Sequence, residues 1–214
     1  KNLYFKYPNS KDYVLDNFST QIKIGNFIGV KGKTGSGKTT FIDIFLGLID
    51  ITKGQIIIDG KTLNTKKNYI GNVAYVPQQA SIFDTSILNN ITFFSSEEKF
   101  DQNKFDLSVK ISLSDIFINK LKDKQNYVVG ERGVKLSGGQ KQRIGIARGI
   151  FQNPKILVLD ESTNALDYKT ENFVLTNLKE YASKNKLTVI FVTHNKKILK
   201  MCDQIIDIDH AKKE

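Results

Sequence analysis

The sequence predicts an α/β fold built around a mainly parallel β-sheet. Two uninterrupted apolar runs, KILVLDE at 155–161 and TVIFVTH at 188–194, are typical of strands that are covered on both faces, as in parallel sheets. Segments with apolar residues at helical spacing alternate with such strands along the chain, and this order favours parallel pairing. The chain has 214 residues, which is enough for one core and a small subdomain.

The first part of the chain predicts a strand, a glycine-rich loop and a helix in direct succession. Short apolar stretches at 3–7 and 20–31 contain aromatic or β-branched residues and indicate strands. The glycine-rich loop follows the second stretch. The apolar residues of FIDIFLGLI at 41–49 then fall at helical spacing, which predicts a helix that opens directly from the loop.

The rest of the chain continues this alternation. The Asp59-Gly60 pair within GQIIIDGKTL predicts a hairpin, and VAYVP at 73–77 predicts a strand that ends at its proline. Between about 82 and 135 the β-branched runs become fewer and apolar positions become periodic, which predicts a helical insertion. QIIDID at 204–209 is expected to form the last strand.

Composition and charge narrow the classes of function. No run of about 18 apolar residues is present, so any membrane-spanning segment has to lie in another polypeptide segment. Because the sequence begins at Lys1 with a strand pattern, we expect it to be one domain of a longer chain. The net charge of +10 comes from lysines in every segment, which disfavours a dedicated nucleic-acid surface. The single cysteine, Cys202, excludes an internal disulfide and fits a reducing compartment.

Residues 32–39 form a phosphate-binding pattern. GKTGSGKT fits G-x-x-x-x-G-K-[ST] without a mismatch and stands between a predicted strand and a predicted helix. Glycines let backbone amides turn toward a phosphate, the Lys38 ammonium reaches the β- and γ-phosphates, and the Thr39 hydroxyl can ligate Mg²⁺. A plain glycine turn is the alternative, but this placement favours nucleotide binding. The residues expected to contact the nucleotide here are Gly32, Lys33, Thr34, Gly35, Ser36, Gly37, Lys38, Thr39 and Thr40.

An acidic pair, Asp160-Glu161, ends the apolar run at 155–161. Ligands of open α/β sheets bind at the carboxyl edge of the strands, where this pair is expected to lie. Asp160 would hold Mg²⁺ through water, and Glu161 would polarise the attacking water as general base. The alternative is an acidic helix cap that begins at one of these two residues.

A third motif, Leu136-Ser137-Gly138-Gly139-Gln140, lies between the phosphate loop and the Asp-Glu strand. With the motifs in this order, nearly the whole chain resembles the nucleotide-binding domain of ATP-binding cassette (ABC) proteins, and LSGGQ resembles the family signature. Gln78 is similar to the Q-loop glutamine, Asp167 ends a stretch similar to the D-loop, and His194 is similar to the switch histidine. Tyr7 stands where family members stack an aromatic ring on adenine.

The resemblance implies the ABC ATPase fold. In this fold a P-loop NTPase core with a mainly parallel sheet carries an antiparallel β subdomain and an inserted helical subdomain. We therefore expect 1–214 to be a single ABC ATPase domain, with the helical subdomain at about 82–150 and the transmembrane domain absent from this chain. The resemblance also implies ATP and Mg²⁺ as cofactors.

Roles for the matching residues follow from the same resemblance. Gln78 and His194 would act with Glu161 in catalysis, and Mg²⁺ would be held by Thr39, Gln78 and Asp160. The helix expected to begin at Ser137 would present a second set of free backbone amides. Two copies placed head to tail would bring that helix onto the ATP of the partner, so that two ATP molecules lie at the interface.

Three of these assignments have alternatives. Tyr7 could be an edge-strand tyrosine, because aromatic residues are common in strands. His194 could cap the helix that follows it. Gln79 competes with Gln78 for the Q-loop role, and the spacing after the strand favours Gln78.

Two stretches resemble cassettes of exporters. VGERG at 129–133 is similar to the exporter X-loop, although Tyr127 stands where a threonine is usual. GKTGSGKTT followed by FIDIFLGLI resembles cassettes of bacterial exporters and flippases that move lipids or lipid-linked saccharides. The D-loop departs from the family, with Ser162 and Asn164 where alanine and serine are commoner. The implied partners are a second ABC ATPase domain, identical or not, and the transmembrane domain of an exporter, at the cytoplasmic face of the inner (plasma) membrane.

Other classes of protein fit the motifs less well. Soluble ABC ATPases of DNA repair and chromosomes carry long coiled coils between the phosphate loop and the signature, and the kind that acts on ribosomes carries two cassettes in one chain. We therefore expect no direct nucleic-acid partner. An importer ATPase made as a separate subunit usually lacks the GERG stretch, and a P-loop small-molecule kinase gives no reason for LSGGQ.

Overall fold

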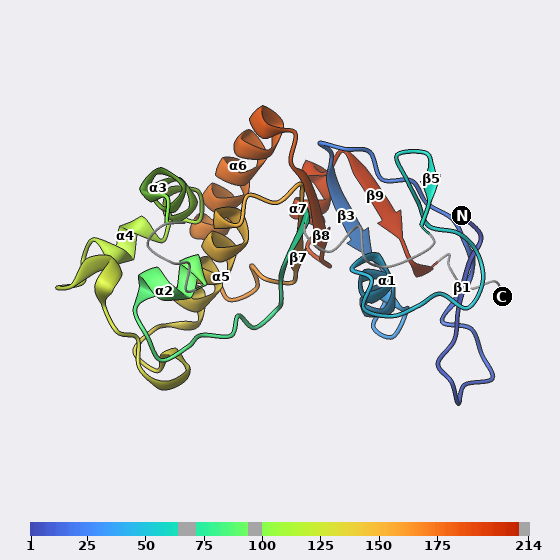
Figure 1. Cartoon of the computed structure of the whole chain (residues 1–214), viewed down its shortest axis with the longest axis horizontal. Coiled ribbons are helices and arrows are strands. Elements are labelled where there is room, and N and C mark those ends of the chain that lie inside the picture. Colours follow the sequence, from blue (N-terminus) through green and yellow to red (C-terminus); the bar gives the residue numbers. More distant parts are fainter. Residues whose placement is uncertain (64–71, 94–99, 210–214) are drawn as a thin grey trace.

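The computed structural model of the chain describes residues 1–63, 72–93 and 100–209. Within these ranges, five parallel strands form the central sheet in the order β6-β7-β8-β3-β9 (Figure 1). The strands are β3 (Phe27–Lys31), β6 (Val73–Val76), β7 (Ile156–Asp160), β8 (Thr188–Val192) and β9 (Gln204–Asp207). The predicted α/β fold with a mainly parallel sheet is confirmed.

Both faces of the sheet are buried, as the uninterrupted apolar runs indicate. Successive side chains of a strand point to opposite faces. In β7, Leu157 and Leu159 therefore belong to one core cluster, whereas Val158 belongs to the other. The first cluster includes residues of α5 (Gly138–Phe151) and α6 (Tyr168–Asn185), and the second includes residues of α1 (Lys38–Phe45). Figure 1 shows α6 and α1 on opposite sides of the strands.

Two short antiparallel pairs accompany the sheet. One joins β1 (Leu3–Phe5) to β2 (Leu15–Phe18), and the other joins β4 (Ile57–Ile58) to β5 (Lys61–Thr62). The second pair is the predicted hairpin. Its two turn residues have φ angles of 49° at Asp59 and 80° at Gly60. Two consecutive positive φ angles match the turn type that favours Asp-Gly, because this turn follows the twist of the strands.

The strand predicted over 20–31 is wrong in its first half, since only Phe27–Lys31 is extended in the sheet. A turn precedes it, in which the Asn26 amide donates to the Lys23 carbonyl and Gly25 has a φ of 79°. The strand predicted over 3–7 ends early, at Phe5. β2 was not predicted. The left-handed backbone at Asn17, with a φ of 52°, disturbs the alternation of inward and outward side chains by which a strand is recognised in a sequence.

The segment between β6 and β7 is mostly helical in its described part. It contains α2 (Ile87–Thr92), α3 (Gln102–Ile111), α4 (Asp115–Ile118), two short 3-10 turns and α5. The 3-10 turns are η4 (Lys124–Asn126) and η5 (Glu131–Gly133). A third apolar cluster, which includes Ile87, Phe105 and Ile144, holds these helices together. α5 joins this region to the sheet, because Ile146 packs in the sheet cluster while Ile144 packs in the helical one.

The chain ends with α7 (Lys196–Met201) and β9. Cys202 follows α7 and lies half-buried against the sheet cluster, where burial raises the pKa of its thiol to about 11. It therefore behaves as a small apolar residue. None of the helices in the described ranges combines the length and the apolar character needed to cross a bilayer.

Candidate functional site

Four groups of predicted site residues follow the carboxyl ends of four parallel strands. The phosphate loop follows β3, Gln78 follows β6, Glu161 follows β7 and His194 follows β8. Since the strands are parallel, their carboxyl ends meet at one edge of the sheet, which is where open α/β sheets bind ligands. The sheet topology therefore gathers residues that are far apart in the sequence.

The phosphate loop connects β3 to α1 and depends on glycine at its end. Gly37 is the residue before the first turn of α1 and has a φ of 102°. A Cβ at Gly37 would lie 2.8 Å from Cγ1 of Val14, so no other residue fits this position. The loop thus leads directly into α1, whose first-turn amides have no acceptor within the helix, and α1 has no acidic residue in that turn. Such a helix start binds anions through its free N–H groups and its dipole.

Lys38 closes over the loop. Its ammonium Nζ donates to the carbonyl of Gly32 at 2.8 Å and to the carbonyl of Lys33 at 3.0 Å. The cation therefore lies across the mouth of the loop, bound to neutral acceptors that a phosphate oxygen would outcompete, because charge-assisted hydrogen bonds are the stronger kind.

Tyr7 lies next to the start of α1. Its hydroxyl is within 3.2 Å of Oγ1 of Thr40, and its ring packs edge-on against Phe5 with centroids 5.0 Å apart. The residue is 48% exposed, which leaves ring surface available to a flat ligand beside the phosphate loop. Tyr7 lies beyond the end of β1, so its alternative interpretation as a strand residue is wrong.

Asp160 forms a pair with a residue that sequence reasoning did not identify. The Tyr75 hydroxyl donates to Oδ2 of Asp160 at 2.9 Å, from the neighbouring strand β6. Burial raises the pKa of Asp160, the Tyr75 hydroxyl lowers it, and the nearby charge of Glu161 raises it again. Burial, and then Asp160, also raise the pKa of Asp43 on α1. The charge of Asp160 thus disfavours ionisation of Asp43, the charge of Glu161 disfavours that of Asp160, and a bound cation would offset both effects.

The donor set suits magnesium. Within residues 1–63, 72–93 and 100–209, no three His, Cys, Asp or Glu side chains are grouped to hold a metal by themselves. Mg²⁺ typically takes one or two carboxylates and completes its shell with water and substrate phosphates. Asp160, the Thr39 hydroxyl and the Gln78 amide oxygen are all oxygen donors of the kind it prefers. The half-buried carboxylate of Asp160, with its raised pKa, would be stabilised by such a cation.

Glu161 is the centre of a second group of side chains. Its Oε2 accepts hydrogen bonds from Nε2 of Gln78 at 3.2 Å and from Nδ2 of Asn164 at 3.1 Å. Nε2 of His194 lies 3.8 Å from its Oε1. The structure thus brings together the three predicted catalytic residues, and the glutamine that contacts Glu161 is Gln78. In the sequence, Asn164 is only a departure from the D-loop pattern, and nothing near it predicts its hydrogen bond to Glu161.

The backbone aims Glu161 away from its strand. Glu161 has a φ of 46°, in the left-handed region that non-glycine residues rarely occupy. Its amide donates to the carbonyl of Val192 at 3.0 Å, so the conformation is held by the neighbouring strand. The predicted alternative of an acidic cap is wrong, because α6 begins at Tyr168 and Asp167 caps it. The alternative for His194 is also wrong, since Asn195 caps α7.

The signature motif forms the start of α5. Ser137 caps the helix: its Oγ accepts from the Gln140 amide at 3.3 Å, and the Gln140 side chain accepts from the Ser137 amide at 2.8 Å. This reciprocal cap satisfies two donors, so fewer amides are free than we expected. None of the described residues accepts a hydrogen bond from the amides of Gly138 and Gly139, which remain for an external acceptor. Leu136 is buried and anchors the motif.

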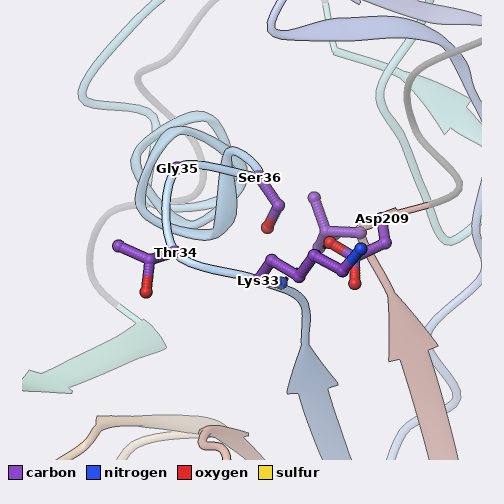
Figure 2. A pocket seen from close by; sticks show the side chains of 6 residues that line it. Lys33, Thr34, Gly35, Ser36 and Asp209 are labelled. Atoms are coloured by element: carbon purple, nitrogen blue, oxygen red, sulfur yellow. Dashed lines mark hydrogen bonds between the residues drawn. The ribbon is translucent and has the colours of Figure 1, made fainter.

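A hollow of about 330 Å³ lies beside the signature motif. It is lined by Ser137, Gly138, Gly139, Arg143, Ala165, Leu166, Asp167 and Thr170. A second hollow of about 250 Å³ lies at the phosphate loop, and Figure 2 shows Lys33, Thr34, Gly35 and Ser36 along it. The two hollows have no lining residue in common. The described residues therefore form two separate hollows, one at the phosphate loop and one at the signature motif.

Gln142 connects the signature helix to the other motifs. It is 6% exposed, and its amide side chain accepts from the Ala165 backbone amide at 2.8 Å and donates to the Gln78 carbonyl at 3.4 Å. One turn of α5 thus contacts both the D-loop and the Q-loop. Sequence reasoning did not identify Gln142, because a glutamine on a helix gives no sign of being buried.

Comparison with known proteins agrees with this geometry. The family model described as "ABC transporter" matches residues 15–164. The chain belongs to the ABC transporter family. It is 34% identical over 213 residues to an ATP-dependent lipid A-core flippase of Haemophilus influenzae, a match that covers 99% of this chain and 36% of the relative. It is also 37% identical over 216 residues to the alpha-hemolysin translocation ATP-binding protein HlyB of Escherichia coli, covering 99% of this chain and 30% of the relative.

A solved structure gives the same result. A bacterial Atm1-family ABC exporter with ATP bound superposes with a TM-score of 0.88 and 32% identity, over 98% of this chain and 36% of that one. The ABC ATPase fold predicted from the motifs is therefore confirmed. The chain matches one part of these proteins, and it spans about a third of their length.

Proposed function

We propose that this chain binds and hydrolyses ATP to power export or flipping of a substrate across a membrane, and that two such domains do so as a head-to-tail dimer. The observation that carries the proposal is that the start of α5 lies at a hollow that shares no lining residue with the hollow at the phosphate loop. A single chain uses the phosphate loop for its own nucleotide. The amides of Gly138 and Gly139 then complete the nucleotide site of the partner.

Each group has a defined part in the reaction. The loop amides and the Lys38 ammonium bind the β- and γ-phosphates, and Tyr7 stacks on the adenine. Glu161 takes the proton of the attacking water, while the amides of Gln78 and Asn164 hold its carboxylate in place. His194, 3.8 Å from the carboxylate, contacts the γ-phosphate side of the site. Mg²⁺, when bound by Asp160, Thr39 and Gln78, neutralises charge on the phosphates.

The relatives support a membrane partner. Their names describe a lipid A-core flippase, a translocation protein and an exporter, and each is about three times as long as this chain. We infer that a transmembrane domain of an exporter lies elsewhere in the assembly and that this domain acts at the cytoplasmic face of the membrane. ATP would hold the two ATPase domains together, and hydrolysis would release them.

Complementation between two inactive variants tests the head-to-tail arrangement. Glu161→Gln removes the base, and Ser137→Arg blocks the signature hollow. In a mixed dimer, one site combines both defects while the other has an intact Glu161 and an intact Ser137. At equal concentrations half of the dimers are mixed, so we expect roughly one quarter of the activity of the unsubstituted chain to return.

The mixture also needs a control for helix capping. Loss of the Ser137 cap alone costs about 1 kcal/mol of stability. Ser86 caps α2 by the same kind of bond to the Asn89 amide, at 3.1 Å. Ser86→Arg should therefore lower the melting temperature similarly but leave hydrolysis intact. If the mixture of the two inactive variants stays as inactive as each variant alone, the shared site is refuted.

A further inference from the structure

We propose that Asp209 is a positioning residue for the phosphate loop, and this inference rests on the proposed nucleotide binding. Asp209 follows β9, next to the point where β3 enters the loop. Its Oδ1 accepts a hydrogen bond from the backbone amide of Lys33 at 2.8 Å. Figure 2 shows Asp209 and Lys33 at the same hollow, with Ser36 beside them.

The bond continues the pairing of two strands into the loop. β3 and β9 run parallel up to the Lys31–Asp207 pair, whose side chains form an ion pair of 2.8 Å. The Ile208 amide then donates to the Lys31 carbonyl at 2.9 Å. Beyond this point the backbones separate, and the Asp209 side chain reaches the next loop amide. A second bond, from the Asp209 amide to Oδ1 of Asp207 at 3.0 Å, holds Asp209 in place.

The carboxylate fixes the orientation of the peptide unit between Gly32 and Lys33. A trans peptide is planar, and its N–H and C=O point in opposite directions. On one side the Lys33 amide donates to Asp209, and on the other side the Gly32 carbonyl accepts from the Lys38 ammonium at 2.8 Å. One carboxylate thus determines where the carbonyl that holds the Lys38 ammonium points, and a carboxylate acceptor also polarises that peptide.

The loop is closely packed around Gly32, so that a side chain at this position would clash with its neighbours. A Cβ built on Gly32 would lie 2.5 Å from Oγ of Ser36 and 3.3 Å from Oδ1 of Asp209. Ser36 is only 8% exposed, and its Oγ makes no hydrogen bond within the described structure. Asp209 therefore packs directly against the first glycine of the loop. Without the carboxylate, this peptide would be free to rotate, and the loop would lose part of its preorganised shape before phosphate binds.

The experiment separates positioning from general stability. Asp209→Ala removes the acceptor, whereas Asp209→Asn keeps an oxygen in the same place. Asp203 is the matched control, because its Oδ2 accepts from the Phe27 amide at 2.8 Å, at the opposite end of β3. The affinities of the 214-residue chain for ATP and for inorganic tripolyphosphate, which lacks adenine, are measured by calorimetry without Mg²⁺, together with melting temperatures.

We expect Asp209→Ala to weaken binding of both compounds roughly fivefold, the effect of losing one hydrogen bond. Asp209→Asn should bind as the unsubstituted chain does, and Asp203→Ala should lower the melting temperature without changing either affinity. Equal weakening by Asp203→Ala, or a failure of asparagine to restore binding, would overturn the inference. If the unsubstituted chain binds ATP and Asp209→Ala binds it as tightly, only this inference fails. If the unsubstituted chain binds neither compound, the proposed function fails as well.

Discussion

Replacement of Glu161 by glutamine isolates the chemical step from the binding step. Both amides that approach Glu161, from Gln78 at 3.2 Å and from Asn164 at 3.1 Å, donate to the same oxygen, Oε2. A glutamine side chain has the same shape, and its single carbonyl oxygen can accept both bonds. The substitution therefore keeps the geometry and removes only the base. A general base contributes about 10² to 10⁴ in rate, which corresponds to about 2.7 to 5.5 kcal/mol of the activation barrier.

We expect single-turnover hydrolysis to fall at least about a hundredfold in this variant, while the ATP dissociation constant from calorimetry changes less than about twofold. Light scattering should show a dimer that persists with ATP and Mg²⁺, because release depends on hydrolysis. Glu180→Gln, at an exposed position of α6, is the control and should behave like the unsubstituted chain. A loss of less than about tenfold in Glu161→Gln would refute the assignment of the base.

Two further predictions concern Lys38 and Tyr75. Lys38→Ala removes the ammonium that spans the loop at 2.8 Å from the Gly32 carbonyl, so calorimetry should detect no ATP binding; an unchanged affinity would contradict the first phosphate site. Tyr75→Phe removes the only hydroxyl described on Asp160, which should cost about 1 kcal/mol in urea unfolding at neutral pH. Because that hydroxyl lowers the pKa of Asp160, its loss raises a pKa that burial already holds above 3.8. A carboxyl whose pKa is raised in the folded state costs stability as the pH rises through that pKa. The loss of unfolding free energy in Tyr75→Phe should therefore shrink as the pH falls toward 3.8. A loss that does not depend on pH would count against the pair of Tyr75 and Asp160.

The phosphate loop and the strands were predictable because their signals are local. Gly37 adopts a φ of 102°, which favours glycine, so a glycine at this position of the sequence indicates a turn. The run Ile156–Asp160 is apolar throughout because both faces of the sheet are covered. The errors have local causes too. The strand predicted over 20–31 is shorter than expected because of the turn at Gly25. β2 was missed because the backbone is irregular at Asn17.

The partners of the proposed catalytic groups were not predictable. Tyr75 meets Asp160 because β6 and β7 are neighbours in the sheet, and strand order cannot be derived from the apolar pattern of either strand. Asn164 reaches Glu161 because Glu161 adopts a left-handed backbone conformation. Gln142 is polar yet buried between two loops, which is the reverse of what its residue type indicates.

Local patterns were enough to find the phosphate loop, the acidic pair and the signature motif, because each depends on the chemistry of adjacent residues and on the backbone freedom of glycine. The set of side chains that meet at the carboxyl edge of the sheet follows from the fold as a whole. Parallel pairing brings Gln78, Glu161 and His194 together across long stretches of chain, and it places the Asp209 carboxylate against the Lys33 amide. These contacts depend on strand order and on the directions of individual side chains, which are set by packing of the whole core rather than by any local pattern.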